Sequence, residues 1–343
     1  MTDGRVESAE FSAAQTAQPQ LRERGEVLEV RDLTDVIYAL RLRIAHFAPA
    51  RPGQFINLEV PGYFLRRPLA IADLVRFPDG SVHLTVIVAQ VGAGTRALRK
   101  VPVGAQISVL GPLGHGFDLD DLEESEDLHD SRNWHNTGKS DDVNDSHVAG
   151  NANRTGSRQP VLIGGGSGIP PLYFLAQELR QRGLRPQVYL GFRCADAVYY
   201  EQEFTALGCD VVVATEDGSH GIAGFATSAL PDDASAVAGV YACGPTGMLY
   251  AVQAWLRTVT AANDAAARAE ISAQIPDAQI PESDCADETK LFTAQLSLEA
   301  RMGCGFGACL GCTVHTVRGL ERVCVEGPVF AASDVLLAAE QVR

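Results

Sequence analysis

Four cysteines near the C-terminus have a type and a spacing that can do chemistry. Cys304, Cys309, Cys312 and Cys324 follow the pattern C-x4-C-x2-C-x11-C, which is the plant-type ligand pattern of a [2Fe–2S] cluster. Four glycines and an alanine among residues 303–312 would let main-chain amides approach the cluster sulfides. A zinc site with four thiolates stays open as an alternative, although such sites usually show two separate CxxC pairs. The favoured chemistry is the transfer of single electrons.

Composition limits where this chemistry takes place. The chain of 343 residues is long enough for two or three domains. It has no apolar run of membrane-spanning length and no N-terminus that resembles a signal peptide. The other cysteines (Cys194, Cys209, Cys243 and Cys285) show no framework-like spacing. We therefore expect free thiols in a reducing cytoplasm.

The net charge of −15 is concentrated in two stretches, residues 119–147 and 260–290, which carry −8 and −5. Both stretches are poor in large apolar residues, so we expect an acidic insertion over 119–159 and an acidic, alanine-rich linker over 259–290. Residues 1–21 are polar and are expected to form a disordered leader. The first insertion holds three histidines without fixed spacing, which does not favour a metal site. The remaining body is close to neutral, which argues against nucleic acid as a ligand.

Residues 22–118 alternate apolar and polar side chains between turn signals. Strands are expected at 25–30, 36–42, 55–60, 83–88 and 105–110. Pro-Gly and Asp-Gly turns separate them. This pattern predicts a small antiparallel Greek-key β-barrel.

Residues 160–258 alternate strands with helices instead. Strands are expected at 161–163, 187–190, 210–215 and 239–242, and helices at about 172–182, 201–207 and 246–257. Such alternation predicts an α/β domain with a parallel sheet that binds ligands at the carboxyl ends of its strands. Residues 291–343 then form a small C-terminal cluster module.

Two turns of the α/β domain are candidate nucleotide-binding elements. Gly164, Gly165, Gly166 and Gly168 lie between the first strand and its helix, where main-chain amides can face a pyrophosphate. Cys243, Gly244 and Pro245 end the last strand. Tight glycine turns occur in many sheets, and Cys243 could equally be an ordinary buried thiol. The first turn does not have the GxGxxG pattern of dinucleotide-binding dehydrogenases.

The barrel contains two further candidates. Arg66 and Arg67 precede Pro68 in an extended apolar segment suited to a diphosphate. Gly94 and Thr95 offer amides and a hydroxyl at the start of a short helix. The alternatives are two ordinary surface arginines for the first candidate and a plain hairpin loop for the second.

The order of these motifs resembles the ferredoxin–NADP reductase superfamily, and more closely the electron-transfer subunits of type B dihydroorotate dehydrogenase. The segments that carry the resemblance are 65–73, 110–117, 164–172, 243–246, 299–309 and 323–330. The terminal segments are the most specific part. The resemblance covers most of the chain apart from the leader and the two acidic stretches.

The resemblance implies that FAD is held in the barrel. The residues it assigns to FAD are Arg67, Pro68, Leu69, Ala70, Ile87, Val88, Ala89, Gly94 and Thr95. It assigns NAD to the glycine turn and to Cys243–Pro245, and the four cysteines to the cluster. The family commonly has Ser at the position of Ala70 and Tyr-Arg at Val88-Ala89. Arg193, without a nearby acid, leaves NADP open as the nucleotide.

The implied function is NAD-dependent electron transfer in pyrimidine biosynthesis. A partner subunit with FMN would oxidise dihydroorotate, and electrons would pass through the cluster and FAD to NAD+. The implied assembly is a heterotetramer with two copies of each subunit, and this chain is expected to hold no acid–base residue for the pyrimidine. The alternatives are a reductase subunit for ferredoxin or a glutamate-synthase-like partner, and a non-catalytic iron–sulfur or zinc sensor.

Overall fold

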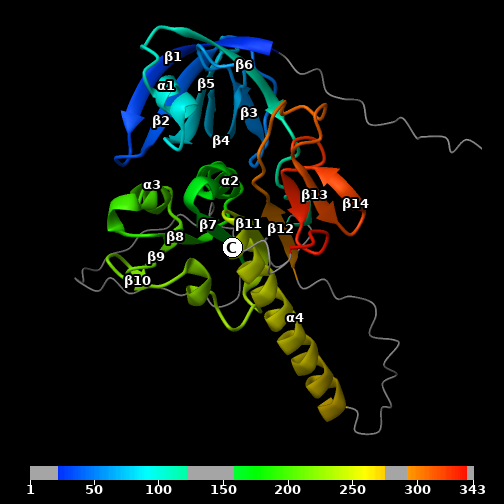
Figure 1. Ribbon diagram of the computed structural model, residues 1–343. Helices are drawn as coiled ribbons and strands as arrows, with labels where there is room; N and C mark the ends of the chain where they lie inside the picture. Colours follow the sequence, from blue (N-terminus) through cyan, green and yellow to red (C-terminus); the bar gives the residue numbers. More distant parts are fainter. Residues whose placement is uncertain (1–21, 123–157, 275–291, 338–343) are drawn as a thin grey trace, which may run out of the picture.

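A computed structural model describes residues 22–122, 158–274 and 292–337 (Figure 1). Three parts lie against one another: a β-barrel, a layered α/β unit below it, and a small module with the strands β13 and β14 at their side. No helix in the described part of the chain is long and apolar enough to cross a membrane.

The first part is a closed antiparallel barrel with the strand order β1-β2-β5-β4-β3-β6. Its strands are β1 (Arg22–Asp32), β2 (Ile37–Ile44), β3 (Phe55–Leu58), β4 (Arg67–Arg76), β5 (Val82–Ala89) and β6 (Gln106–Leu113). The hairpins β3-β4-β5 with β2 beside β5 make a Greek key, as the sequence predicts. Alternate residues of β2, from Tyr38 to Ile44, are fully buried in the barrel, which is the period-two pattern of a strand with one core face.

One barrel strand was expected only as an extended segment. Strand β4 begins at Arg67 and runs to Arg76, pairing with both β3 and β5. Pro68 has no main-chain N–H to donate, which weakens the sequence signal for a strand that is hydrogen-bonded on both sides. The short helix α1 (Ala93–Arg99) follows β5.

The second part is a seven-stranded sheet in the order β10-β9-β8-β7-β11-β12-β15. Its strands are β7 (Gln159–Gly165), β8 (Gln187–Phe192), β9 (Asp210–Thr215), β10 (Ile222–Ala223), β11 (Val237–Cys243), β12 (Thr293–Ser297) and β15 (Val329–Ala331). Its helices are α2 (Ile169–Gln181), α3 (Glu201–Ala206) and α4 (Thr246–Gln274). The pairs from β10 to β12 are parallel and β15 is antiparallel. The parallel α/β unit is therefore confirmed.

Two boundaries differ from the expectation. Strands β12 and β15 belong to residues 291–343, yet they extend the sheet of the nucleotide unit, so the C-terminal part shares a sheet with that unit. Helix α4 was expected to end near Arg257 but continues to Gln274 and projects beyond the sheet (Figure 1). The alanine-rich composition of residues 261–269 explains the longer helix, because alanine has the highest helix propensity.

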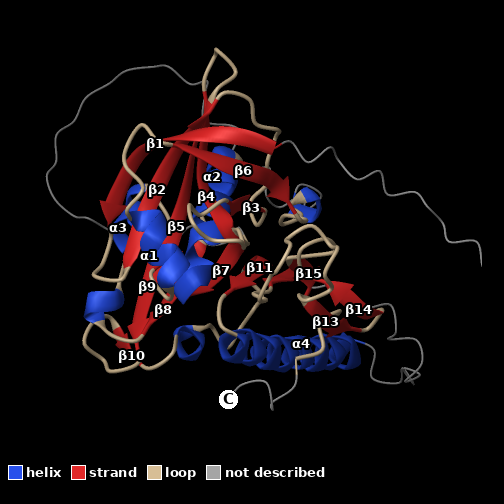
Figure 2. Ribbon diagram, turned by 45° about the horizontal axis from the view of Figure 1, so that its top comes forward, coloured by secondary structure: helices blue, strands red, loops and turns tan. Residues whose placement is uncertain are grey.

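The remaining strands, β13 (Thr313–Thr316) and β14 (Gly319–Arg322), form a hairpin near the β15 edge of the sheet (Figure 2). Short 3-10 turns occur at Asp120–Leu122, Gly166–Gly168, Ala195–Ala197 and Ala226–Ala229. The expected leader, nearly all of the insertion after Leu122, residues 275–290 of the expected linker and Cys285 lie outside the described residues.

Candidate functional site

A cavity of about 240 Å³ lies where the barrel, the nucleotide unit and the cysteine-bearing segment meet. The barrel contributes Gly53, Phe55, Pro68, Leu69, Ala70 and Ile87. The nucleotide unit contributes Ser167, Pro170, Pro171 and Cys243, and the C-terminal part contributes Ser297, Leu298, Glu299, Ala300, Met302 and Pro328. The cavity is at the carboxyl ends of β7 and β11, where parallel sheets bind their ligands. We call it the central cavity.

The barrel wall of the central cavity contains four of the candidate FAD residues, Pro68, Leu69, Ala70 and Ile87. Val88 behaves differently, because its side chain is fully buried in the barrel core. Neighbouring residues of a strand point to opposite faces, so Ile87 faces outward when Val88 faces inward. Any contact of Val88 with a cofactor would therefore involve its main chain. Ala89 is the last residue of β5 and is half-buried.

The two adjacent arginines have different surroundings. Arg66 turns toward the barrel strands, where its guanidinium donates to the carbonyl oxygens of Asn57 and Ser108, both at 3.1 Å. Arg67 lies against Gly94, so closely that a Cβ at position 94 would overlap its guanidinium. The Arg67 guanidinium and the start of α1 therefore lie side by side, as the binding of one diphosphate by both would require. Arg66 instead connects barrel strands through its hydrogen bonds.

The hydroxyl of Thr95 is used inside its own turn. It accepts from the main-chain N–H of Gly92 at 3.2 Å and donates to the carbonyl oxygen of Gly92 at 3.1 Å. The Tyr38 hydroxyl donates to the Thr95 carbonyl oxygen at 2.8 Å. Thr95 is 8% exposed. It shapes the start of α1, and its hydroxyl would have to leave these partners to reach a phosphate.

The two nucleotide turns lie against each other. A Cβ at Gly168 would overlap the carbonyl oxygen of Cys243, and a Cβ at Gly244 would lie 3.0 Å from the Gly165 carbonyl oxygen. Gly166 has a positive φ of 53°, a conformation that favours glycine. The structure therefore brings together both turns that the sequence singled out, at one edge of the sheet.

Two residues beside these turns were missed by sequence reasoning. Ser297 is the last residue of β12, Glu299 follows that strand, and both line the central cavity with Cys243. Burial raises the pKa of the Cys243 thiol to about 12, Glu299 adds to that effect, and a hydrogen bond with Ser297 opposes it. Cys243 is thus a neutral thiol near neutral pH. The signal that could have found them is the parallel pairing of β12 with β11, which sets Ser297 opposite Cys243.

The four cysteines of the quartet lie in residues 304–324, in the C-terminal part of the chain that also contributes to the central cavity wall. Burial alone raises the pKa of the Cys304 thiol, but main-chain N–H groups of Phe306 and Cys309 and the Cys309 thiol lower it to about 6. Burial and contact with the Cys312 thiol raise the pKa of Cys324 to about 12. The Cys304 and Cys309 thiols are therefore hydrogen-bonded, as are those of Cys312 and Cys324, and Cys304 also raises the pKa of Cys324.

This pairing fits a two-iron centre, because each iron of a [2Fe–2S] cluster takes two protein thiolates. In the described residues, no three His, Cys, Asp or Glu side chains converge as they would around one ion. Gly303 and Gly311 leave room beside Cys309, since a Cβ at either would lie 3.3 or 3.5 Å from its sulfur. Arg322 supports the loop by donating to the Gly307 carbonyl oxygen at 3.2 Å and by pairing with Glu326.

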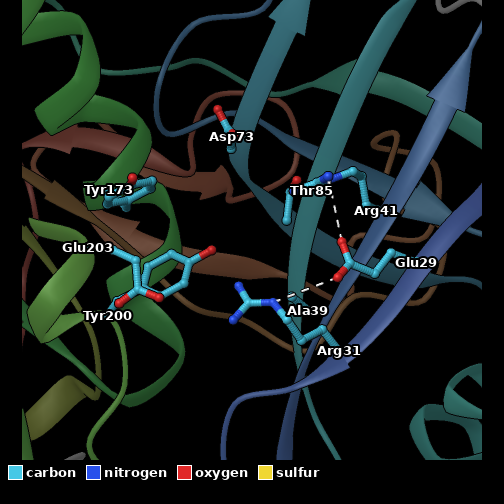
Figure 3. A pocket seen from close by; sticks show the side chains of 9 residues that line it. All are labelled: Glu29, Arg31, Ala39, Arg41, Asp73, Thr85, Tyr173, Tyr200 and Glu203. Carbon is cyan, nitrogen blue, oxygen red and sulfur yellow. Dashed lines mark ion pairs between the residues drawn. The ribbon is translucent and has the colours of Figure 1, made fainter. Parts of the chain in front are cut away.

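A second, polar cavity of about 150 Å³ lies between barrel strands and residues of α2 and α3 (Figure 3). Arg31 and Arg41 share the carboxylate of Glu29, at 4.0 and 3.6 Å. Across the cavity lie the rings of Tyr173 and Tyr200. The sequence motifs gave no indication of this cavity, because its residues come from outward positions of four barrel strands and from two segments of the nucleotide unit.

Solved structures establish the fold class. The chain is similar to an NADH-dependent reduced ferredoxin–NADP oxidoreductase studied for flavin-based electron bifurcation, with a TM-score of 0.62, 22% identity and coverage of 92% of this chain and 94% of the other. A cytochrome P450 reductase from Amycolatopsis gives a TM-score of 0.54 and 24% identity over 72% and 69% of the two chains. The molecule thus has a ferredoxin-reductase-like fold.

Sequence relatives are more specific. Residues 299–336 match the family model for the iron–sulfur cluster binding domain of dihydroorotate dehydrogenase B. The electron transfer subunit of dihydroorotate dehydrogenase B (NAD+) from Bacillus caldolyticus is 34% identical over 92% of this chain and 99% of its own. The subunit from Shouchella clausii is 32% identical over 84% and 87%. This chain belongs to the family of dihydroorotate dehydrogenase B (NAD+) electron transfer subunits.

Proposed function

We propose that this chain passes electrons from a dihydroorotate-oxidising partner to NAD+ in pyrimidine biosynthesis. The observation that carries the proposal is the central cavity, which the barrel, the nucleotide turns and the cysteine-bearing segment wall together. An electron relay needs its carriers side by side, and here the barrel wall, the nucleotide turns and the segment next to the cysteines meet. Family membership supports the same conclusion.

Each part of the chain has a separate task in this proposal. Pro68, Leu69, Ala70 and Ile87 hold the FAD ring system, while Arg67 with the start of α1 holds its diphosphate. The glycine turn and Cys243–Pro245 bind NAD, and Cys304, Cys309, Cys312 and Cys324 bind the iron–sulfur cluster. Ala89 and the main chain of Val88 complete the barrel wall.

FAD supplies the exchange between single electrons and a hydride, and the cluster supplies the single-electron step. The protein contributes geometry and burial. Apolar side chains and prolines form much of the central cavity wall, and the neutral Cys243 thiol places no charge beside the nucleotide turn. In this chain we assign no acid–base residue to the pyrimidine reaction, which belongs to the partner.

The partner is inferred from the family. An electron transfer subunit requires a catalytic subunit, and we propose an FMN-containing dihydroorotate dehydrogenase subunit in a heterotetramer with two copies of each chain. The free thiols of Cys194 and Cys209 are compatible with the reducing cytoplasm that we propose as the location. Neither a ferredoxin or glutamate-synthase-like partner nor a sensor role is favoured, because the relatives carry the dihydroorotate dehydrogenase name.

The proposal is tested by isolating the chain from native extract under anaerobic conditions with whatever subunit accompanies it. We expect an FMN-bearing protein and dihydroorotate-dependent reduction of NAD+ by the isolated complex. A complex that reduces NAD+ from ferredoxin or glutamate, and not from dihydroorotate, would contradict the proposed partner while keeping the reductase fold. Comparing NAD+ with NADP+ in the same assay decides the nucleotide.

A further inference from the structure

Strand β3 connects the barrel wall of the central cavity to the cysteine loop through one side chain. Asn57 is 1% exposed, and its Nδ2 donates to the carbonyl oxygen of Cys304 at 2.8 Å. In the barrel ladder, Asn57 stands opposite Pro68, and the flanking pairs are Ile56 with Leu69 and Leu58 with Arg67. Asn57 therefore links the barrel wall directly to the main chain of the first cysteine of the quartet.

The loop is shaped to receive this side chain. Gly305 has a φ of 77°, and a Cβ at this position would lie 2.5 Å from Asn57 Nδ2. A side chain at position 305 would therefore be strained and would also displace the amide. The orientation of the amide follows from its partner, because the flipped rotamer would set Oδ1 against the Cys304 carbonyl oxygen.

The other half of the amide gives no stabilisation. Asn57 Oδ1 is buried and has no hydrogen-bond partner among the described residues. A buried acceptor without a partner is unfavourable for folding, and an apolar residue of the same shape would remove that cost. The stability of the barrel therefore does not explain an asparagine at position 57. The hydrogen bond to Cys304 does explain it.

We propose that Asn57 is a positioning residue that fixes the cluster loop to the FAD wall and tunes the cluster through its amide dipole. This inference rests on the proposed binding of the cluster by the cysteine quartet. Hydrogen bonds and charges around a cluster set its reduction potential. The amide presents its N–H toward the Cys304 main chain, and a donor at this place favours the reduced cluster.

The test compares the intact protein with Asn57→Leu, Asn57→Asp and a matched control, Gln295→Leu. Gln295 is also a buried amide that joins the C-terminal part to the barrel end, since it accepts from Asp118 N at 2.9 Å and donates to Asp118 O at 2.6 Å. It does not touch the cysteine loop in the described structure. The control separates a general loss of domain contacts from an effect on the cluster.

Three quantities are measured on anaerobically purified protein: the cluster midpoint potential from a redox titration followed by EPR, the rate of cluster loss to an iron chelator, and Tm. In Asn57→Leu we expect a lower cluster midpoint potential and a Tm that is not lower than that of the wild-type protein. We also expect roughly fivefold faster cluster loss, because one hydrogen bond is lost. Asn57→Asp should lower the potential further, because it adds a negative charge. Gln295→Leu should lower Tm and leave the potential unchanged.

Both Asn57 variants with wild-type potential and wild-type cluster loss would overturn the inference. So would a potential shift of equal size in Gln295→Leu. Absence of iron from the wild-type protein would instead refute the proposed cluster itself, so the two failures are distinguishable. If Asn57→Asp does not fold, Asn57→Leu alone decides the question.

Discussion

Gly168 lies in direct contact with Cys243: a single methyl group at position 168 would overlap the Cys243 carbonyl oxygen. The two residues are 75 positions apart in the sequence: Gly168 lies in the turn after β7, and Cys243 is the last residue of β11. The contact joins the glycine turn to the Cys-Gly-Pro turn and makes them one continuous surface, which we propose faces the nucleotide.

Gly168→Ala is therefore expected to separate these turns. The overpacked contact should cost about 1–3 kcal/mol of stability and raise the KM for NADH, while flavin and iron contents stay at wild-type values. Steady-state kinetics with an artificial electron acceptor, together with visible spectra, measures this. An unchanged KM for NADH would mean that the contact does not shape the nucleotide site.

Gly94→Ala should weaken FAD binding, because the new methyl group would take the place of the Arg67 guanidinium. We expect about tenfold weaker binding, which corresponds to about 1.4 kcal/mol. Gly92→Ala is the matched control, since a Cβ there would meet nothing within 4 Å and the φ of −154° is extended. Fluorescence of released flavin on dilution measures both. Equal flavin loss in the two variants would show that the space beside Arg67 is not the cause.

Cys304→Ser should abolish electron passage beyond FAD and leave FAD reduction by NADH nearly intact. The reason is that removal of one thiolate breaks the Cys304 and Cys309 pair that one iron needs. Cys194→Ser, at a thiol on the nucleotide unit, should retain wild-type iron and activity. Stopped-flow absorbance separates the flavin and cluster phases. Simultaneous loss of both phases in Cys304→Ser would contradict the proposed order of carriers.

The Tyr200→Phe variant should lose less stability than the wild-type protein when the pH is raised into the alkaline range. Burial is the largest effect that raises the pKa of the Tyr200 phenol above 10.0, and the neighbouring Tyr173 raises it further. The unfolded chain then releases this proton at a lower pH than the folded chain, so stability falls as pH rises from about 10. Phenylalanine removes that dependence, and it costs no hydrogen bond that the structure shows for the hydroxyl.

Urea denaturation of both proteins at pH 8 and at pH 10.5 measures this difference. We expect similar stabilities at pH 8 and a smaller decrease at pH 10.5 in Tyr200→Phe. A decrease of the same size in both proteins would show that Tyr200 does not carry the alkaline dependence.

Local sequence signals were sufficient to predict those elements and turns whose pattern lies within one short stretch of the chain. Strand β9 (Asp210–Thr215) was predicted to the residue, because a continuous apolar run lies between turn residues. The glycine turn, Cys243–Pro245 and the cysteine spacing are similarly local, and the structure places the two nucleotide turns in contact. The small antiparallel Greek-key barrel was also predicted from punctuated alternation, although β4 was expected only as an extended segment.

The remainder depends on contacts between distant segments. Nothing near Asn57 in the sequence indicates that it reaches Cys304, because they are 247 positions apart. The inward direction of Val88 could be obtained only from the register of β5, which sets Val88 opposite Tyr38. The role of Arg66 in the barrel was equally hidden, since its partners Asn57 and Ser108 lie on other strands.

The most direct test is EPR spectroscopy of the anaerobically purified chain before and after addition of NADH, with iron and flavin quantified on the same sample. The account predicts about two iron atoms and about one FAD per chain, and a [2Fe–2S] signal that develops on NADH addition. Zinc in place of iron, a preparation free of flavin, or a cluster that NADH leaves oxidised in the presence of FAD would contradict it.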